Sequence, residues 1–420
     1  MQIKLPYGKT YLTADLPDIF SAEMIVPQDT TPADDPAQTV IDALDHPTGD
    51  RSLEQFRGAK SVAIAVNDKT RPVPHNDLLP PLLERLEGLG IAPENITLVI
   101  ATGTHPVMPP EEYAWILPQA IIERYPIVCH DAYDESTHTY LGETERGTPI
   151  FINSVYMNAD LRLVVGNIEP HQFMGFSGGV KSAAIGVAGK ETINQNHAMM
   201  MDENAKLGTY DNNPARQDVE EIGRMMSIHL ALNALLNGKK QIVDVLFGDP
   251  VAVMQVAIPR VRRIYQVPLT APFDLIIASP GGNPKDINVY QAQKGLGHAT
   301  LAMNDGGTVI LCAACPEGTG SASYENWITD GTKHSHEDVF SHFKQEGFHV
   351  GPHKAYQISR DAARVRVMMI TDMPADFVRQ LLLHPLPDLQ TAINKAIADL
   401  PADARIGIMP GANNTIPLLA

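Results

Sequence analysis

The residue types that can do chemistry are most concentrated between Asn167 and His197, in the stretch NIEPHQFMGFSGGVKSAAIGVAGKETINQNH. This stretch contains the imidazoles of His171 and His197, the amine of Lys181 and a glycine-rich loop. It follows the apolar run 161–165, which is typical of a strand, and open α/β folds bind ligands beyond the carboxyl ends of their strands. The stretch therefore indicates an enzyme with a bound cofactor.

The glycine-rich loop at residues 175–182, GFSGGVKS, is similar to a nucleotide-phosphate loop but departs from one. A P-loop has glycine directly before its lysine, whereas Val180 precedes Lys181 here. The sequence also lacks a G-x-G-x-x-G motif placed as in ordinary NAD-binding proteins. Gly178 and Gly179 still let the backbone approach a ligand closely. Lys181 could bind a phosphate electrostatically or act as a covalent nucleophile.

Reactive side chains also follow other strand-like runs. Asp68, Thr70 and Arg71 come after the run 61–66, His105 comes after 96–101, and Tyr290, Gln291 and Lys294 come after 275–279. Because the carboxyl ends of parallel strands share one edge of a sheet, such loops can converge on one cleft. Four loops of this kind favour an active site over coincidence.

Most of these side chains also have a plainer interpretation. Asp68 could cap a helix that starts after Pro72, because Asp is a good N-cap and Pro suits a first helical turn. Arg71 beside the N–H groups of a helix start would form a site for phosphate or carboxylate. A single histidine such as His105 or His171 is more often structural than catalytic, but both follow strand ends and adjoin a proline. The pair therefore favours acid–base chemistry.

His197 lies in an expected helix over residues 191–201. A helical histidine is usually structural, but its imidazole could also bind a transition metal. The sequence has no H-E-x-x-H motif and no pair of cysteines to join it, so a zinc hydrolase site is unsupported. A single protein ligand would suffice only if a cofactor supplied the others.

The elements that must position these residues are expected as alternating strands and helices. Apolar runs expected as strands cover residues 61–66, 96–101, 161–166, 275–279, 308–311, 365–370 and 406–409. They lack period-2 alternation, which is typical of strands covered on both faces. Helical patterns such as 77–89 and 215–236 lie between them, which predicts an α/β fold with mainly parallel sheets flanked by helices. The first residues predict a hairpin turning near Tyr7-Gly8, and 27–36 a surface loop.

A chain of 420 residues exceeds what one hydrophobic core usually serves, so two domains are expected. Proline-containing breaks near 247–250 and 268–272 place the boundary around residue 250, with the helical pattern 215–236 as a candidate connection. The first expected domain, residues 1–250, holds Lys181 and the candidate site histidines His105, His171 and His197. The second, residues 251–420, holds the loop after 275–279. We expect the active-site cleft between them.

The composition argues against several protein classes. Lys and Arg number 32 against 49 Asp and Glu, and the formal net charge of −17 repels nucleic-acid backbones and anionic membranes. Neither a signal peptide nor a membrane-spanning helix is expected from the sequence. Three cysteines are too few for a disulfide framework, so a reducing cytoplasm is the simplest location. Cys312 and Cys315 form a C-x-x-C pattern, which we interpret as buried cysteines at a strand end.

Six segments together resemble the nickel-dependent lactate racemase family, more broadly the nickel-pincer 2-hydroxyacid racemases and epimerases. The segments are Asp68-Lys69-Thr70-Arg71-Pro72, Gly103-Thr104-His105-Pro106, Glu169-Pro170-His171, Ser177-Gly178-Gly179-Val180-Lys181, Asn196-His197 and Tyr290-Gln291-Ala292-Gln293-Lys294. The resemblance covers nearly the whole chain. The order and spacing of the segments are far more specific than any one of them.

The resemblance implies a cofactor and residues that hold it. The family's cofactor is a nickel-pincer nucleotide of the pyridinium-3,5-dithiocarboxylic acid mononucleotide type, in which two sulfur-bearing arms and a ring carbon bind nickel. Lys181 resembles the lysine joined covalently to one arm, and His197 resembles the fourth nickel ligand. Asp68, Thr70 and Arg71 match the segment that holds the nucleotide and the substrate. Proteins of cofactor synthesis are implied as maturation partners.

The resemblance also implies a reaction. His105 and His171 resemble the paired acid/base histidines of the family, which racemises lactate or a related 2-hydroxy acid. In the family mechanism one histidine takes the hydroxyl proton while hydride passes to the cofactor, and the other serves the mirror-image substrate. Imidazole suits this task because its ordinary pKa lies near working pH. Arg71, Tyr290, Gln291 and Lys294 are implied to bind the substrate, the last two at its carboxylate.

Two other functions remain open from the residues themselves. A hydrolase or dehydratase without nickel could use His105 and His171, with Lys181 as an anion binder. A nucleotide- or cofactor-binding protein without turnover could use the same loops for storage or maturation. An adduct on Lys181 and bound nickel would distinguish the racemase from the hydrolase or dehydratase, and racemisation of a 2-hydroxy acid would distinguish it from the binding protein.

Overall fold

The computed structural model describes residues 1–398 and 400–419, and a six-stranded sheet organises its first unit, Asp29–Ile264. The strand order is β13-β12-β9-β4-β5-β6, and every pairing is parallel except β12 with β13. The strands are β4 (Val62–Asn67), β5 (Ile96–Ala101), β6 (Ile127–Cys129), β9 (Leu161–Asn167), β12 (Leu230–Leu236) and β13 (Ile242–Gly248). Two hairpins accompany them, β7 (His138–Glu143) with β8 (Pro149–Asn153), and β10 (Pro170–His171) with β11 (Gly175–Phe176).

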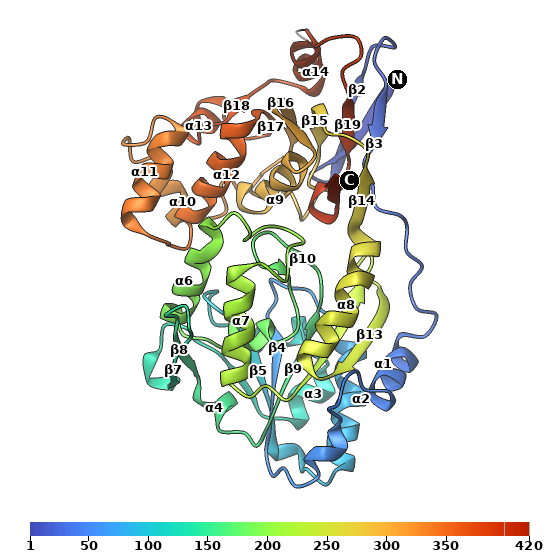
Figure 1. The fold of residues 1–420 in the computed structure, drawn as a ribbon, viewed down its shortest axis with the longest axis vertical. Helices are drawn as coiled ribbons and strands as arrows, with labels where there is room; N and C mark the ends of the chain where they lie inside the picture. Colours follow the sequence, from blue (N-terminus) through green and yellow to red (C-terminus); the bar gives the residue numbers. More distant parts are fainter. Residues whose placement is uncertain (399, 420) are drawn as a thin grey trace. The chain divides into compact units, whose positions relative to one another are not determined.

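Helices flank this sheet (Figure 1). They are α1 (Pro36–Asp45), α2 (His75–Gly88), α3 (Gln119–Arg124), α4 (Ser154–Met157), α5 (Lys181–Ala184), α6 (Lys190–Ala198), α7 (Pro214–Met225) and α8 (Pro250–Tyr265), which reaches the unit boundary. Leu78, Leu82 and Leu86 of α2 pack in one core with Ile64 and Leu98 of the sheet. Both α4 and α5 contact β4, and α5 also contacts β9.

A second six-stranded sheet organises the other unit, which combines Met1–Gln28 with the residues from Tyr265 onward. Its order is β18-β17-β16-β15-β19-β3, and all its pairings are parallel. The strands are β3 (Ala22–Met24), β15 (Phe273–Ala278), β16 (Met303–Cys312), β17 (Arg366–Ile370), β18 (His384–Pro385) and β19 (Ile406–Met409). Smaller pairs are β1 (Gln2–Tyr7) with β2 (Thr10–Asp15), and β14 (Gln266–Leu269) with β20 (Ile416–Leu419).

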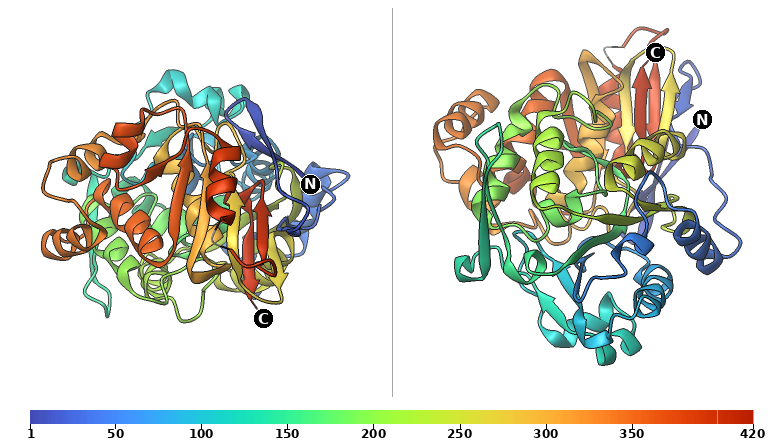
Figure 2. Two further views of the ribbon diagram at one scale, coloured as in Figure 1. Left: turned by 90° about the horizontal axis from the view of Figure 1, so that it is seen from above. Right: turned by 60° about the horizontal axis from the view of Figure 1, so that its bottom comes forward.

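Among the described residues, two hydrophobic cores lie in this second unit. The helices are α9 (Val289–Thr300), α10 (Ala322–Ile328), α11 (His336–Glu346), α12 (Pro352–Arg364), α13 (Ala375–Gln380) and α14 (Leu389–Ile397). One core joins Leu296 of α9 and Ile358 of α12 to the sheet. The other joins Leu5 of β1 and Ile393 of α14 to Ile277 of β15. In Figure 2 the blue N-terminal strands accordingly lie beside the red strands near the C-terminus.

The α/β prediction with parallel sheets is confirmed, and each expected strand is present. The N-terminal hairpin also turns at Gly8, whose φ of +51° suits glycine. The predicted helix over 215–236 is wrong in its second half, because α7 ends at Met225 and β12 follows. All seven residues of β12 are buried between β9 and β13. A fully buried strand has no alternation of apolar and polar residues, so the apolar run of β12 could not be distinguished from a continuation of the helical pattern of α7.

The unit boundaries differ from the expected ranges 1–250 and 251–420. The chain divides after Gln28 and after Ile264, so the N-terminal hairpin belongs with the C-terminal sheet. The physical cause is β3, which pairs with β19, together with the apolar face of β1 in the core of that sheet. Within the described residues, no helix is both long and apolar enough to cross a membrane.

Candidate active site

Three adjacent strands of the first sheet end at the candidate site. β4 leads to Asp68, Thr70 and Arg71, β5 leads to His105, and β9 leads to His171. β4 lies between β5 and β9 in the sheet. After β4 the chain adds β5 and β6 on one side, and it then returns to add β9 on the other side of β4. The site loops therefore surround the point where the strand order reverses, which is where open α/β sheets bind ligands.

Asp68 holds the ring of His105. Oδ2 of the buried Asp68 lies 2.7 Å from Nδ1 of His105, and its Oδ1 accepts hydrogen bonds from the Thr70 hydroxyl (2.7 Å) and backbone N–H (3.1 Å). The Thr70 hydroxyl oxygen also lies 3.1 Å from Nδ1. A carboxylate only accepts, so Nδ1 of His105 carries a proton and Nε2 of the neutral ring has the lone pair. This geometry replaces the helix-cap interpretation of Asp68, because α2 begins only at His75.

The electrostatics of Asp68 agree with this pairing. Burial alone would raise the pKa of its carboxyl, but the hydrogen bond and charge interaction with His105 lower it below its ordinary value. Thr70 and Arg71 add to the lowering. Asp68 is therefore ionised and positioned to stabilise a proton on His105.

His171 lies in the short hairpin of β10 and β11, where it pairs with Gly175. The backbone N–H of Met174 donates to Nδ1 of His171 at 3.3 Å, which places the proton of the neutral ring on Nε2. The two candidate acid/base histidines thus have opposite tautomers. The ring of Phe173 lies edge-on to both His171 (4.9 Å between centroids) and His197 (5.0 Å), so it separates the acid/base ring from the candidate metal ligand.

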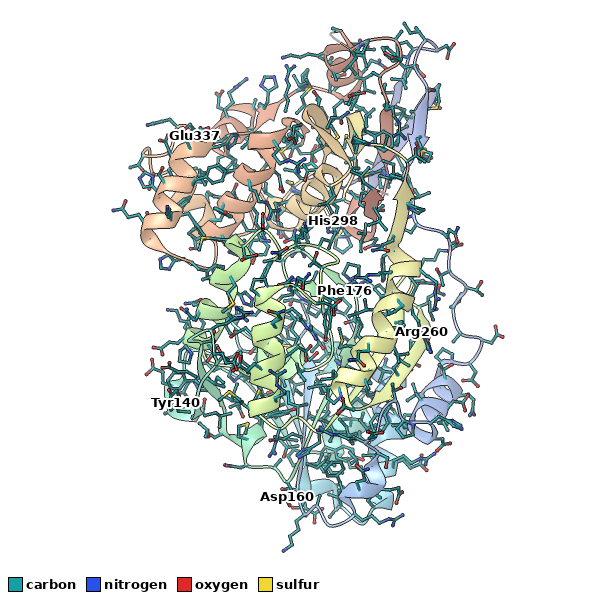
Figure 3. The ribbon with its side chains drawn as sticks, viewed as in Figure 1. Tyr140, Asp160, Phe176, Arg260, His298 and Glu337 are labelled. Atoms are coloured by element: carbon teal, nitrogen blue, oxygen red, sulfur yellow. The ribbon has the colours of Figure 1, made fainter. Side chains whose placement is uncertain are left out.

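The glycine-rich loop is held from several sides. Gly175, Gly178 and Gly179 have positive φ angles, and a Cβ at Gly175 would lie 1.8 Å from the carbonyl oxygen of Thr209. The guanidinium of the buried Arg216 donates to the carbonyls of Phe176 (3.1 Å) and Gly178 (3.2 Å) and pairs with Glu220 (2.6 Å). Phe176 in this loop and Asp160, just before β9, lie at opposite ends of the unit in Figure 3. These contacts and hydrogen bonds restrict the conformation of the loop.

Lys181 is the first residue of α5 and is only partly accessible to solvent. Burial lowers the pKa of its amine to about 7, and the positive charges of Arg71 and Arg216 contribute to the lowering. A large fraction of the amine is thus neutral near neutral pH, which is the form that attacks an electrophile. Positive charge also gathers locally in a chain whose net charge is −17, which suits an anionic ligand.

His197 lies near the end of α6, with Nδ1 3.1 Å from Oδ1 of the buried Asn196. Burial lowers the pKa of His197 to about 3, and the charges of Lys181 and Arg71 add to this effect. The ring is therefore neutral at working pH, as a metal ligand must be. The exposed guanidinium of Arg71 forms no ion pair with a carboxylate in residues 1–398 and 400–419, so it is available to an anion.

The remaining predicted residues lie in the second unit. Tyr290, Gln291 and Lys294 occupy the first turns of α9, which follows β15 and is capped by Asn288. The Lys294 amine donates to Oε1 of Gln291 at 2.6 Å, which pairs an amine with a carboxamide. The ring of Tyr290 has the Lys354 amine 4.5 Å from its centroid. β15 lies between β16 and β19, so α9 starts at the reversal point of this sheet too.

The structure thus brings Asp68 and Thr70 to His105, and places Phe173 between His171 and His197. Sequence reasoning missed Phe173, Arg216 and Asp218, a buried carboxylate of α7 that accepts a hydrogen bond from Asn196, and it treated Asn196 only as a neighbour of His197. Arg216 and Asp218 could have been noticed only as charged residues on the buried face of the amphipathic helix α7. That face is not known until the helix is placed.

Comparisons with known proteins show the family to which the chain belongs. The chain matches the family models of the lactate racemase N-terminal domain at residues 7–208 and the lactate racemase C-terminal domain at residues 269–416. It is 29% identical over 420 residues to a lactate racemase of Thermoanaerobacterium thermosaccharolyticum, covering 97% of each chain. It is 34% identical over 334 residues to a lactate racemase of Lactiplantibacillus plantarum, covering 78% of each.

Solved structures show the same similarity. The lactate racemase apoprotein of Thermoanaerobacterium thermosaccharolyticum superimposes with a TM-score of 0.92 over 100% of both chains, at 29% identity. A protein of Thermotoga maritima shares the fold with a TM-score of 0.67 over 94% of this chain and 100% of that chain, at 19% identity. The first similarity spans both units and every candidate site residue.

Proposed function

Because this chain belongs to the lactate racemase family and is an isomerase, we propose that it racemises or epimerises a 2-hydroxy acid, lactate or a close relative. The observation that carries this proposal is the placement of His105 and His171 after the two strands that flank β4. Mirror-image 2-hydroxy acids present their hydroxyl groups on opposite sides. Two bases on opposite sides of one strand end can serve both without moving.

His105 is the better prepared base of the two. Its Nε2 has the lone pair that would accept the substrate hydroxyl proton, and Asp68 would stabilise the resulting imidazolium. His171, whose neutral ring presents Nε2–H, would act on the opposite enantiomer from its imidazolium form, so that giving one proton to the substrate oxygen leaves the neutral ring. After one turnover the protonation states of the two rings are exchanged, so the pair can work in both directions.

The chain's own residues fit a nickel-pincer nucleotide. The neutral fraction of the Lys181 amine would form the covalent attachment, and the neutral imidazole of His197 would be a nickel ligand. When bound, this cofactor supplies a hydride acceptor that no protein side chain provides. Arg71 and the glycine-rich loop would hold its anionic groups. Asp68 and Thr70 belong to the same loop as Arg71 and contact His105, so the loop that holds the nucleotide would also position the base.

The substrate carboxylate needs cationic partners in this acidic protein. We propose Arg71, and the paired Lys294 and Gln291 with Tyr290 beside them, as the substrate-binding residues. An amine held by a carboxamide is fixed in position and keeps hydrogen atoms for further acceptors. Proteins of cofactor synthesis would be needed for maturation.

The function is tested with full-length protein made together with the cofactor-synthesis enzymes. Single enantiomers of lactate and other 2-hydroxy acids are incubated with it and followed by chiral chromatography, and intact mass and nickel content are measured. We expect racemisation by protein that carries an adduct on Lys181. Adduct without racemisation of any substrate would favour a cofactor-binding protein. Turnover by unmodified, nickel-free protein would favour the hydrolase or dehydratase.

The histidine roles are tested by His105→Ala and His171→Ala. Each should lower racemisation by at least about 100-fold, because general acid–base catalysis contributes this much, while the adduct and nickel remain. His46→Ala is the control, because His46 is an exposed histidine at the end of α1. Loss of the adduct in either variant, or unchanged racemisation, would contradict the assignment.

A further inference from the structure

A buried carboxylate on α7 lies behind the candidate metal ligand. Asp218 is fully buried and accepts hydrogen bonds from the hydroxyls of Thr144 (2.6 Å) and Thr148 (3.0 Å) and from Nδ2 of Asn196 (2.8 Å). No Lys, Arg or His forms an ion pair with it in residues 1–398 and 400–419. A carboxylate buried without a cation is costly, and three neutral donors satisfy it only if they are correctly oriented.

These bonds fix the orientation of the Asn196 carboxamide. Its Nδ2 donates to Asp218 and to the backbone carbonyl of Ala215 (3.0 Å), and neither of these partners can donate a hydrogen bond. A flipped carboxamide would place its oxygen against two acceptors, so the flip is excluded. Oδ1 of Asn196 must therefore face His197.

The orientation of Asn196 in turn fixes the ring of His197. Oδ1 of Asn196 only accepts, so Nδ1 of His197, 3.1 Å away, is the nitrogen that carries the proton. In the neutral ring the lone pair is then on Nε2. Four buried polar side chains thus determine which nitrogen of His197 can bind a metal.

We propose that Asp218 and Asn196 are positioning residues that orient His197 as a ligand through Nε2 for a divalent transition metal. The proposal rests on the proposed role of His197 as the nickel ligand. It goes beyond that role by assigning two further residues, neither of which touches substrate or metal. The negative charge of Asp218 polarises the Asn196 amide, and an imidazole that donates to such an acceptor is a stronger ligand.

The test is made first on the cofactor-free full chain with ¹⁵N-labelled histidine. Ring nitrogen shifts report the tautomer directly, and His197→Gln identifies the signal of His197. Wild-type His197 should show a protonated Nδ1 and an unprotonated Nε2. Asn196→Leu should shift the ring toward the opposite tautomer or a mixture, whereas Gln195→Leu, which removes an exposed amide from the same helix, should not.

The second measurement is the rate at which loaded protein loses nickel to a chelator. Asn196→Leu should increase this rate by about 10-fold or more, as is usual when a residue that orients a metal ligand is lost. Asp218→Asn keeps the shape and the hydrogen bonds to Thr144 and Thr148 but removes the charge, so the rate should rise while the tautomer is retained. If Asn196→Leu does not fold, the rate of nickel loss from Asp218→Asn alone tests the positioning role.

The outcomes separate this proposal from the role of His197 itself. If both variants fold and lose nickel at the wild-type rate with an unchanged tautomer, the positioning role is overturned. If instead His197→Gln retains nickel as wild type does, the ligand role of His197 fails. The tautomer shift in Asn196→Leu would then still show that Asn196 orients the ring.

Discussion

At the scale of single residues, the environment of Lys181 and His197 favours the neutral forms that their proposed roles require. An amine attacks and an imidazole binds metal only without their extra protons, and burial lowers the pKa of both Lys181 and His197. The charge of Arg71 lowers both further. In the proposed site this one arginine would have two effects, because it would attract an anion and it favours the deprotonated forms of its neighbours.

The reactivity of Lys181 should follow this lowered pKa. In cofactor-free protein, acetylation of Lys181 by trace acetic anhydride should rise with pH and reach half its limit near pH 7, because its pKa is about 7. An ordinary lysine reaches this point near about pH 10.4. Mass spectrometry of the labelled peptide across a pH series gives the midpoint.

Removal of the Arg71 charge supplies the control for this pH dependence. In Arg71→Gln the repulsion on the Lys181 ammonium decreases, so its pKa should rise and the labelling midpoint should move to higher pH. Lys69→Gln, which removes a neighbouring amine paired with Glu112, should leave the midpoint in place. A wild-type midpoint near that of exposed lysines would contradict the described environment.

At the scale of elements, the loops that follow the strands were predictable and the helix that supports them was not. Buried strands have a strong apolar signature, so β4, β5 and β9 and the residues after them could be located. The pattern over 215–236 gave no sign that α7 ends before β12. The buried charges Arg216 and Asp218 point to different partners, the glycine-rich loop and Asn196, and such contacts over a long sequence separation leave no local pattern.

The rigidity of the glycine-rich loop can be tested at Gly175. In Gly175→Ala the new Cβ would lie 1.8 Å from the Thr209 carbonyl oxygen, and φ of +71° adds strain, so the loop must move. Gly90→Ala is the control, because φ is +89° and nothing lies within 4 Å. Gly90→Ala should lower the free energy of unfolding by about 1–2 kcal/mol, the cost of a left-handed residue. In urea titrations, Gly175→Ala should lower it by more, and an equal loss would contradict a tightly held loop.

At the scale of the whole molecule, one unit is built from both ends of the chain. The N-terminal hairpin could be predicted, but not the sheet it would cover, because β3 and β19 are separated by most of the sequence. A boundary near residue 250 followed from local breaks in the pattern. Pairing between distant strands depends on which apolar faces remain uncovered, and this is decided only when both sheets have formed.

This discontinuous unit predicts where a mutation in the first strand will act. Leu5 of β1 is fully buried against residues of β15 and β16, so Leu5→Ala should lower the free energy of unfolding by about 2–5 kcal/mol. Hydrogen exchange should show faster opening of β15, β16 and β19, with β4 and β5 unchanged. Leu418→Ala in β20 is the matched control, because Leu418 is 47% exposed and its loss should change stability by about 0.5 kcal/mol or less. If Leu5→Ala instead accelerated exchange in β4 and β5, the N-terminal hairpin would belong to the first sheet, because a cavity weakens most the core in which it lies.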